Sequence, residues 1–178
     1  MRSVRPELPA LALLLAVGGS VSAETTAPSW PAGAWNPQPA EDDLVLPMPC
    51  GGAMALRKIS VPSSGELDDY KILVGGRDEA RAPIENARVA YLSAPFAAAG
   101  ARAYYLGKYE VSAQQMAALE EGCPEPAADG WLPATEVTWA EAALFAERYS
   151  DWLLRNARDR LPAEDGVPGF LRLPTETE

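Results

Sequence analysis

Residues 133–153 constrain the fold most, because they form a long amphipathic helix with a well-defined start. Thr138 is a good N-cap residue, and Glu141 follows three positions later, which is the spacing of a capping box. Apolar residues then recur at steps of three and four, at Ala142, Phe145, Ala146, Tyr149, Trp152 and Leu153. This period predicts one buried stripe, while charged residues such as Arg148 and Arg155 face water. The helix therefore needs a core to pack against.

The first 23 residues have the features of an export signal. Arg2 and Arg5 precede an apolar run at residues 11–17, and residues 21–23 (Val-Ser-Ala) form a small-residue cleavage site. The apolar run is too short to span a bilayer. We therefore expect removal of residues 1–23, a periplasmic or secreted protein, and no stable membrane span after cleavage.

Residues 24–43 follow as a leader rich in proline, alanine and acidic residues, with no helical or strand period. This composition predicts a tether or extended arm in front of a domain that spans residues 44–178. Trp30 and Trp35 leave two alternatives open, since they either pin the arm to the domain or lie exposed on it.

The domain itself alternates short strands with helices. Strands are expected at residues 44–46, 58–61, 70–74, 87–92 and 103–109. Ser112 and Gln115 then form a second capping box, which opens a short helix with Ala113, Met116, Ala117 and Leu119 on one face. With 17 prolines and 14 glycines, the chain is predicted to be a loop-rich α+β protein.

Charge and residue inventory exclude several kinds of function. The formal net charge is −10 and there is no basic cluster, which argues against nucleic acid or an anionic membrane as partner. The chain has no histidine, so it contains no Ser-His-Asp triad and no histidine-ligated metal. The two cysteines, Cys50 and Cys123, form either one disulfide or two free thiols.

The last residues contain a third capping box, Thr175-x-x-Glu178. It predicts a helix that continues after Glu178, so we expect the chain to be the front part of a longer protein. We also expect the 178-residue chain alone to lack oxidase activity and to fold poorly, with Phe145, Tyr149 and Trp152 left uncovered.

Three sequence strings carry a family resemblance. They are YLGKYEVS at residues 105–112, TEVTWAEA at residues 135–142 and LRLPTETE at residues 171–178. In this order and spacing they resemble the formylglycine-generating enzyme, or sulfatase-modifying factor, family, which includes periplasmic pyoverdine-maturation relatives. The resemblance covers about residues 44–178 and is looser before Tyr105.

The resemblance implies an irregular α+β fold related to C-type lectins, truncated here at its C-terminus. It also implies oxidation of a protein cysteine to formylglycine with O2 and copper. The copper and calcium sites of the family lie beyond Glu178, so no catalytic residue, metal ligand or cofactor is carried over to this chain. Cys50 and Cys123 match none of the family's catalytic positions.

The matching residues are expected to have structural roles. Glu110, Glu136 and Glu176 lie near predicted helix starts, where a buried carboxylate favours the positive end of the helix. Arg172, on a predicted short strand, is a candidate partner for one of them. Trp139 and Trp152 are expected in the core.

Two functions remain open. In the first, the chain is the N-terminal portion of an exported enzyme that acts on a protein or small-molecule substrate outside the cytosol. In the second, it is a non-catalytic lectin-like module that binds a partner, because one scaffold supports both roles. A cysteine pair encoded after Glu178 would favour the enzyme.

Overall fold

The structure is a computed structural model that describes residues 29–63, 68–75, 87–120 and 123–178. Its strands are β1 (Leu44–Met48), β2 (Gly52–Val61), β3 (Tyr70–Val74), β4 (Arg88–Leu92), β5 (Phe96–Ala98), β6 (Ala101–Gly107), β7 (Ala163–Glu164) and β8 (Val167–Pro168). Its helices are α1 (Ala32–Trp35), α2 (Ala113–Ala117) and α3 (Trp139–Asn156), with the 3-10 turns η1 (Pro49–Gly51) and η2 (Arg158–Arg160). The predicted α+β class is confirmed.

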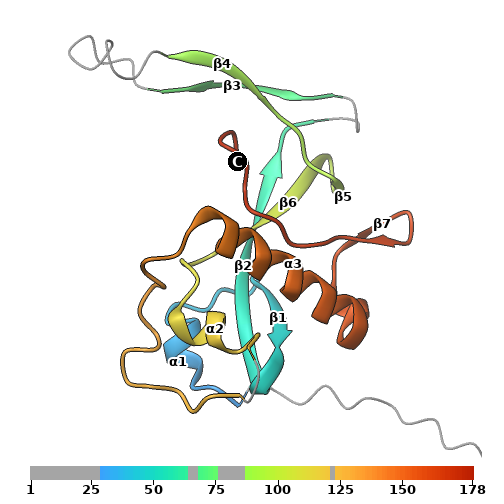
Figure 1. Cartoon of the computed structure of the whole chain (residues 1–178). Helices are drawn as coiled ribbons and strands as arrows, with labels where there is room; N and C mark the ends of the chain where they lie inside the picture. Colours follow the sequence, from blue (N-terminus) through green and yellow to red (C-terminus); the bar gives the residue numbers. More distant parts are fainter. Residues whose placement is uncertain (1–28, 64–67, 76–86, 121–122) are drawn as a thin grey trace, which may run out of the picture.

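A four-stranded antiparallel sheet in the order β1-β2-β6-β5 lies at the centre. Strand β2 joins its two halves, because Gly52 to Leu56 pair with β1 and Leu56 to Val61 pair with β6. Strands β3 and β4 form a separate two-stranded ribbon that projects from the end of this sheet, and α3 crosses beside β1 and β2 (Figure 1). The short hairpin β7-β8 follows α3 in the chain.

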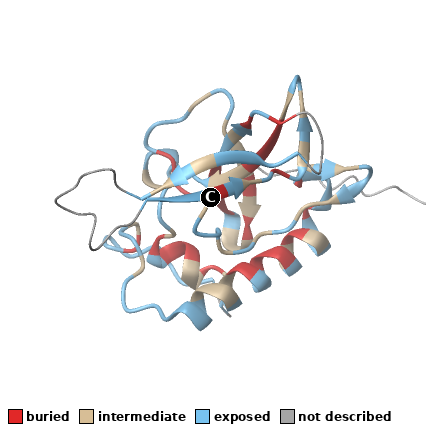
Figure 2. Ribbon diagram, turned by 90° about the horizontal axis from the view of Figure 1, so that it is seen from above, coloured by how far each residue is buried: buried red, intermediate tan, exposed pale blue. Residues whose placement is uncertain are grey.

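The organising helix forms as its sequence predicts. Thr138 caps α3, with its hydroxyl accepting from the Glu141 N–H at 3.3 Å while the Glu141 carboxylate accepts from the Thr138 N–H at 2.8 Å. The predicted stripe turns inward, and its outer side is exposed (Figure 2). Tyr149 and Leu153 are completely buried. The expectation that Tyr149 would be left uncovered is therefore wrong, because β1 covers it within this chain.

The core forms between this helix and the sheet. Its largest cluster of buried side chains comprises Trp30, Leu46, Met48, Met54, Leu56, Ala118, Tyr149, Leu153, Ala157 and Leu161. Because Trp30 belongs to this cluster, residues from Trp30 onward pack as part of the domain. Of the two alternatives left open for the tryptophans, the structure therefore favours the one in which they pin the arm to the domain.

Helix α2 forms at its predicted capping box but buries a different face. Gln114 and Gln115 are buried, whereas Ala113 is exposed and Met116 is only half-buried. The reason lies in β2, because its residues 52–55 pair with β1 on one side but have no partner in β6 on the other. The Gln115 side chain donates to the Ala53 carbonyl at 3.0 Å and the Lys108 N–H to the Ala55 carbonyl at 3.0 Å, so both complete that open edge.

The segment after β8 does not form the short strand expected around Arg172. Instead, the Ser150 hydroxyl accepts from the Leu171 N–H at 2.7 Å and donates to the Leu171 carbonyl at 2.9 Å. The Ser150 side chain thus provides the hydrogen bonds that the N–H and carbonyl of Leu171 would otherwise make to a neighbouring strand. Within the described parts of the chain, no helix is long and apolar enough to cross a membrane. The predicted export signal lies outside the described residues.

Candidate functional site

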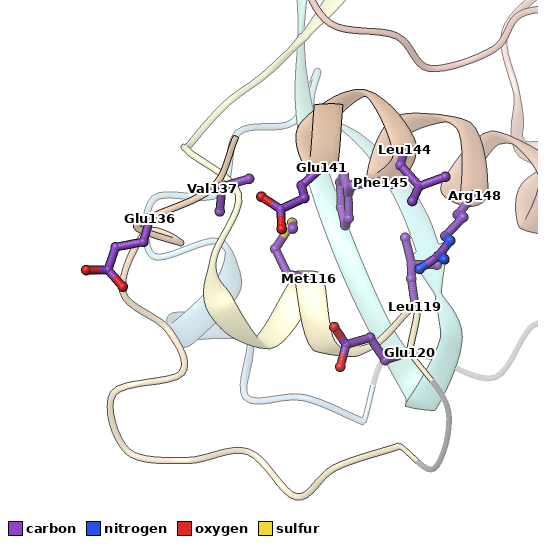
Figure 3. Close-up of a pocket in the computed structure, with 9 residues that line it drawn as sticks. All are labelled: Met116, Leu119, Glu120, Glu136, Val137, Glu141, Leu144, Phe145 and Arg148. Carbon is purple, nitrogen blue, oxygen red and sulfur yellow. The ribbon is translucent and has the colours of Figure 1, made fainter. Parts of the chain in front are cut away.

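A groove lies between α2 and α3 (Figure 3). Its first hollow, of about 280 Å³, is lined by Met116, Leu119, Glu120, Glu136, Val137, Glu141, Leu144, Phe145 and Arg148. A second hollow of about 300 Å³ continues past Pro49, Ala118, Asp151, Trp152 and Arg155. Leu119, Glu120 and Arg148 line both hollows, so the two form one continuous groove.

Local sequence signals position the two walls of the groove. Capping boxes at Ser112 and Thr138 set where α2 and α3 begin. Between the helices, the Ala113 N–H donates to the Leu132 carbonyl at 3.0 Å, and the Ala134 N–H donates to the Val111 carbonyl at 2.9 Å. These bonds hold the start of α2 against the loop that leads into α3.

A disulfide fixes the far end of the groove. Cys50, in the turn η1, is bonded to Cys123, which follows α2, with 5.2 Å between their Cα atoms. Of the two alternatives left open by the sequence, the structure therefore has the disulfide. Pro49 lines the second hollow directly beside it. The bond ties the carboxyl-terminal side of α2 to the β1-β2 connection.

The charges along the groove differ in how they are paired. The hydroxyl and N–H groups of Thr138 hold the pKa of the Glu141 carboxyl below its usual value, so that group is ionised. Asp151 and Arg155 pair with each other at 3.8 Å on the exposed side. The side chains of Glu120 and Arg148 make no hydrogen bond or ion pair with any described residue. In Figure 3, Glu120 and Glu141 flank Met116, and Glu136 points away from the hollow.

The groove presents apolar side chains beside charged ones. The floor is apolar, and no described side chains around it pair an acid or a base with a nucleophile. The copper site that the resemblance implies would need thiolates, and the sulfurs of Cys50 and Cys123 are bonded to each other. Among residues 29–63, 68–75, 87–120 and 123–178, no group of three or more Cys, Asp or Glu residues could hold a metal ion. The described residues therefore do not fit the metal.

The matched residues singled out in the sequence do not converge on one site. Glu110 and Glu136 are exposed. Trp139 is 77% exposed rather than in the core, because α3 is covered only from Ala142 onward. Trp152, by contrast, is half-buried and packs against the main core.

Arg172 has a different partner from the three expected. Its guanidinium makes two bonds to the Glu178 carboxylate, at 2.6 and 2.8 Å, and these hold the pKa of Glu178 below its usual value. Glu176 pairs with Arg88 of β4 instead. Both pairs hold the last described segment in place. The Thr175 N–H also donates to the Glu178 carboxylate at 2.9 Å.

Sequence reasoning missed a buried ion pair between Asp43 and Lys108. Asp43 also accepts from the Asn36 side chain at 3.2 Å and from the Ala40 N–H at 2.9 Å. The bond from Lys108 is the largest of the effects that lower the pKa of Asp43 to about 2. Lys108 lies in the first matching string, but Asp43 lies in the predicted tether, and nothing local distinguishes it from Glu41 and Asp42. Its role is to fasten the α1 segment to the end of β6.

Comparisons with known proteins found no matching family model, no matching curated protein and no matching solved structure.

Proposed function

We propose that this chain supplies the N-terminal portion of an exported protein similar to the formylglycine-generating enzyme family. The main support is the position of the first two matching strings. Residues 105–112 carry β6 into the capped start of α2, and residues 135–142 open α3 at Thr138. The resemblance expects a strand that enters a helix at the first string and a helix that opens at the second. The irregular C-type-lectin-like fold is part of the same proposal.

In this proposal the described residues build the scaffold and contain no catalytic group. The third string, residues 171–178, is held against α3 by Ser150 and braced by the Arg172–Glu178 pair. A segment encoded after Glu178 would then start from a fixed position. The chemistry of the family, oxidation of a protein cysteine to formylglycine, would depend on groups that this chain does not contribute.

The test compares the 178-residue chain with a chain extended by whatever its gene encodes after Glu178. Both are incubated with a cysteine-containing peptide, copper and O2, and formylglycine is measured by mass spectrometry. We expect turnover by the extended chain and none by the 178-residue chain. A control in the extended chain, Cys50→Ser with Cys123→Ser, should retain turnover while folded, because this pair is structural. An inactive extended chain would contradict the proposal.

Export is part of the same proposal and has its own test. The charged start, apolar run and small-residue site at residues 1–23 agree with one another. N-terminal sequencing of the exported protein should begin at Glu24. A mature protein that begins at Met1 would contradict it.

A second candidate function, a non-catalytic binding module, is favoured by the groove between α2 and α3. Its apolar side chains are open to solvent, and the side chains of Glu120 and Arg148 at its rim have no partner among the described residues. Such surfaces are typical of recognition sites. A folded extended chain that binds a partner without oxidising a cysteine would support this function over the first.

A further inference from the structure

We propose that the groove between α2 and α3 docks a protein segment that presents a bulky apolar side chain next to lysine or arginine. The inference deepens the second candidate function and rests on it. It does not require any oxidation, so its test measures binding alone.

The apolar part of the proposal comes from the floor of the groove. Met116 and Leu119 contribute from α2 and the turn after it, while Leu144 and Phe145 contribute from α3. Leu144 is 42% exposed, and Val137 at the upper edge is 37% exposed. Met116, Leu119 and Phe145 are half-buried, so each keeps part of its apolar surface open to the groove. An apolar side chain of a partner would remove that surface from water.

The basic part of the proposal comes from the charges at the rim. Three carboxylates, those of Glu120, Glu141 and Asp151, border the groove, against the two guanidinium groups of Arg148 and Arg155. Glu136 also lines the groove, but its carboxylate points away from it (Figure 3). Asp151 and Arg155 largely cancel each other. The remaining excess is negative and is greatest around Met116, between Glu120 and Glu141 (Figure 3). Cationic groups of a partner would be attracted there.

The net charge of the whole chain favours a different protein over a second copy of this one. Two chains of net charge −10 repel each other, and the same excess steers a cationic partner towards the groove. Self-association through this groove therefore serves as an alternative outcome of the test.

Three acetylated nine-residue peptides provide the probes for titration calorimetry with the oxidised, folded chain extended by whatever its gene encodes after Glu178. The first alternates lysine with leucine and phenylalanine, the second replaces each lysine by glutamate, and the third keeps lysine but replaces the apolar residues by alanine. We expect the first to bind at least about tenfold more tightly than either of the others, with weaker binding at higher salt. No binding of the first peptide, or equal binding of the acidic peptide, would overturn the proposal.

Variants locate the binding on the molecule. Glu120→Arg and Leu144→Ser should each weaken binding of the first peptide roughly 3- to 10-fold, since one reverses a rim charge and the other removes apolar floor. Glu147→Arg is the matched control, because Glu147 is exposed on the same helix but lines neither hollow. Circular dichroism confirms that each variant is folded.

The outcomes separate the groove from the broader function. If Glu147→Arg weakens binding of the first peptide as much as Glu120→Arg does, binding depends only on net charge, and the groove is not the binding site. Tight binding that is unchanged in both Glu120→Arg and Leu144→Ser would also overturn the groove as the binding site. It would still support the second candidate function, a binding module. A concentration-dependent dimer in sedimentation, lost in Glu120→Arg, would overturn the proposed partner in favour of a second copy.

Discussion

At the scale of single residues, Gly52 matters because the indole ring of Trp30 occupies the space where a side chain would be. A Cβ atom at Gly52 would lie within 2.6 to 2.9 Å of three ring atoms of Trp30. Since Trp30 belongs to the main core, this close approach is what brings the segment before β1 onto the sheet. Gly52 therefore sets how closely Trp30 packs on the start of β2.

We predict that Gly52→Ala destabilises the protein by about 1–3 kcal/mol, because the added methyl group displaces the Trp30 ring. Gly33→Ala is the matched control, since nothing lies within 4 Å of a Cβ at that position. Its effect should be neutral or slightly stabilising. Chemical denaturation measures both, and equal effects would contradict the packing of Trp30 on Gly52.

The Asp43–Lys108 pair makes a second residue-scale contribution, and it depends on pH. The pKa of Asp43 falls from 3.8 to about 2 on folding, so the unfolded chain takes up this proton first as the pH decreases. The stabilisation is therefore complete above pH 4 and is lost as the pH falls towards 2.

We expect Asp43→Asn to flatten the decrease in the free energy of unfolding between pH 4 and pH 2. Asp42→Asn, an adjacent and exposed control, should leave the slope as it is in the wild type. Denaturant midpoints measured at intervals across this range provide the test. If Asp43→Asn and the wild type lose stability in parallel, the ion pair does not control the acid transition.

At the scale of elements, α3 organises the chain by its side chains as well as its apolar stripe. Ser150 lies in the buried face of the helix and bonds both main-chain groups of Leu171. Tyr149, one position earlier, bonds the carbonyls of Leu46 and Pro47 in β1, and its burial raises the pKa of its hydroxyl. Neighbouring side chains on one helix therefore hold both the first strand and the last segment.

Replacing Ser150 by alanine should destabilise the protein by about 1–3 kcal/mol, because the Leu171 N–H and carbonyl lose their partner. Ser60→Ala, on an exposed position of β2, should stay within about 0.5 kcal/mol of the wild type. Thermal unfolding compares the two. Hydrogen exchange at Leu171 should also accelerate in Ser150→Ala, and unchanged exchange there would refute the role assigned to Ser150.

At the scale of the whole molecule, two long-range ties close the fold. The disulfide joins positions 73 residues apart and connects the β1-β2 turn to the end of α2. Near the other end of the sheet, the buried Arg102 side chain bonds the Ala94 carbonyl at 2.6 Å and the Glu164 carboxylate at 3.2 Å. The first tie attaches the segment after α2 to the β1-β2 connection, and the second attaches the β7-β8 hairpin to the sheet.

We predict that reducing the disulfide destabilises the protein by about 4 kcal/mol, because a loop of this length gains that much entropy in the unfolded chain. The double variant Cys50→Ser with Cys123→Ser should show the same loss and no further response to reductant. Denaturation with and without reductant provides the measurement. A wild type that is insensitive to reductant after verified reduction would contradict the prediction.

Features decided within a few residues could be predicted from the sequence. The bounds of β3, the capped starts of α2 and α3, and the buried stripe of α3 follow from contacts between residues three or four apart, or from alternation along one strand. The apolar character of Met116, Leu119 and Phe145 was also apparent. That they line a groove was not, because a groove exists only once two helices are placed side by side.

Only the tertiary structure decided what each local element packs against. Gln115 reaches Ala53 across 62 positions, Lys108 reaches Asp43 across 65, and Cys50 reaches Cys123 across 73. No periodic pattern in the sequence specifies such long-range contacts, since they depend on the path of the whole chain. For the same reason Trp30 could be assigned to the core, and Trp139 to the surface, only when the neighbours of each were known. The sequence by itself determined the bounds of β3 and the capped starts of α2 and α3, because these depend on residues close in the chain. The fold determined how far β2 and β6 extend and which faces of the helices are covered.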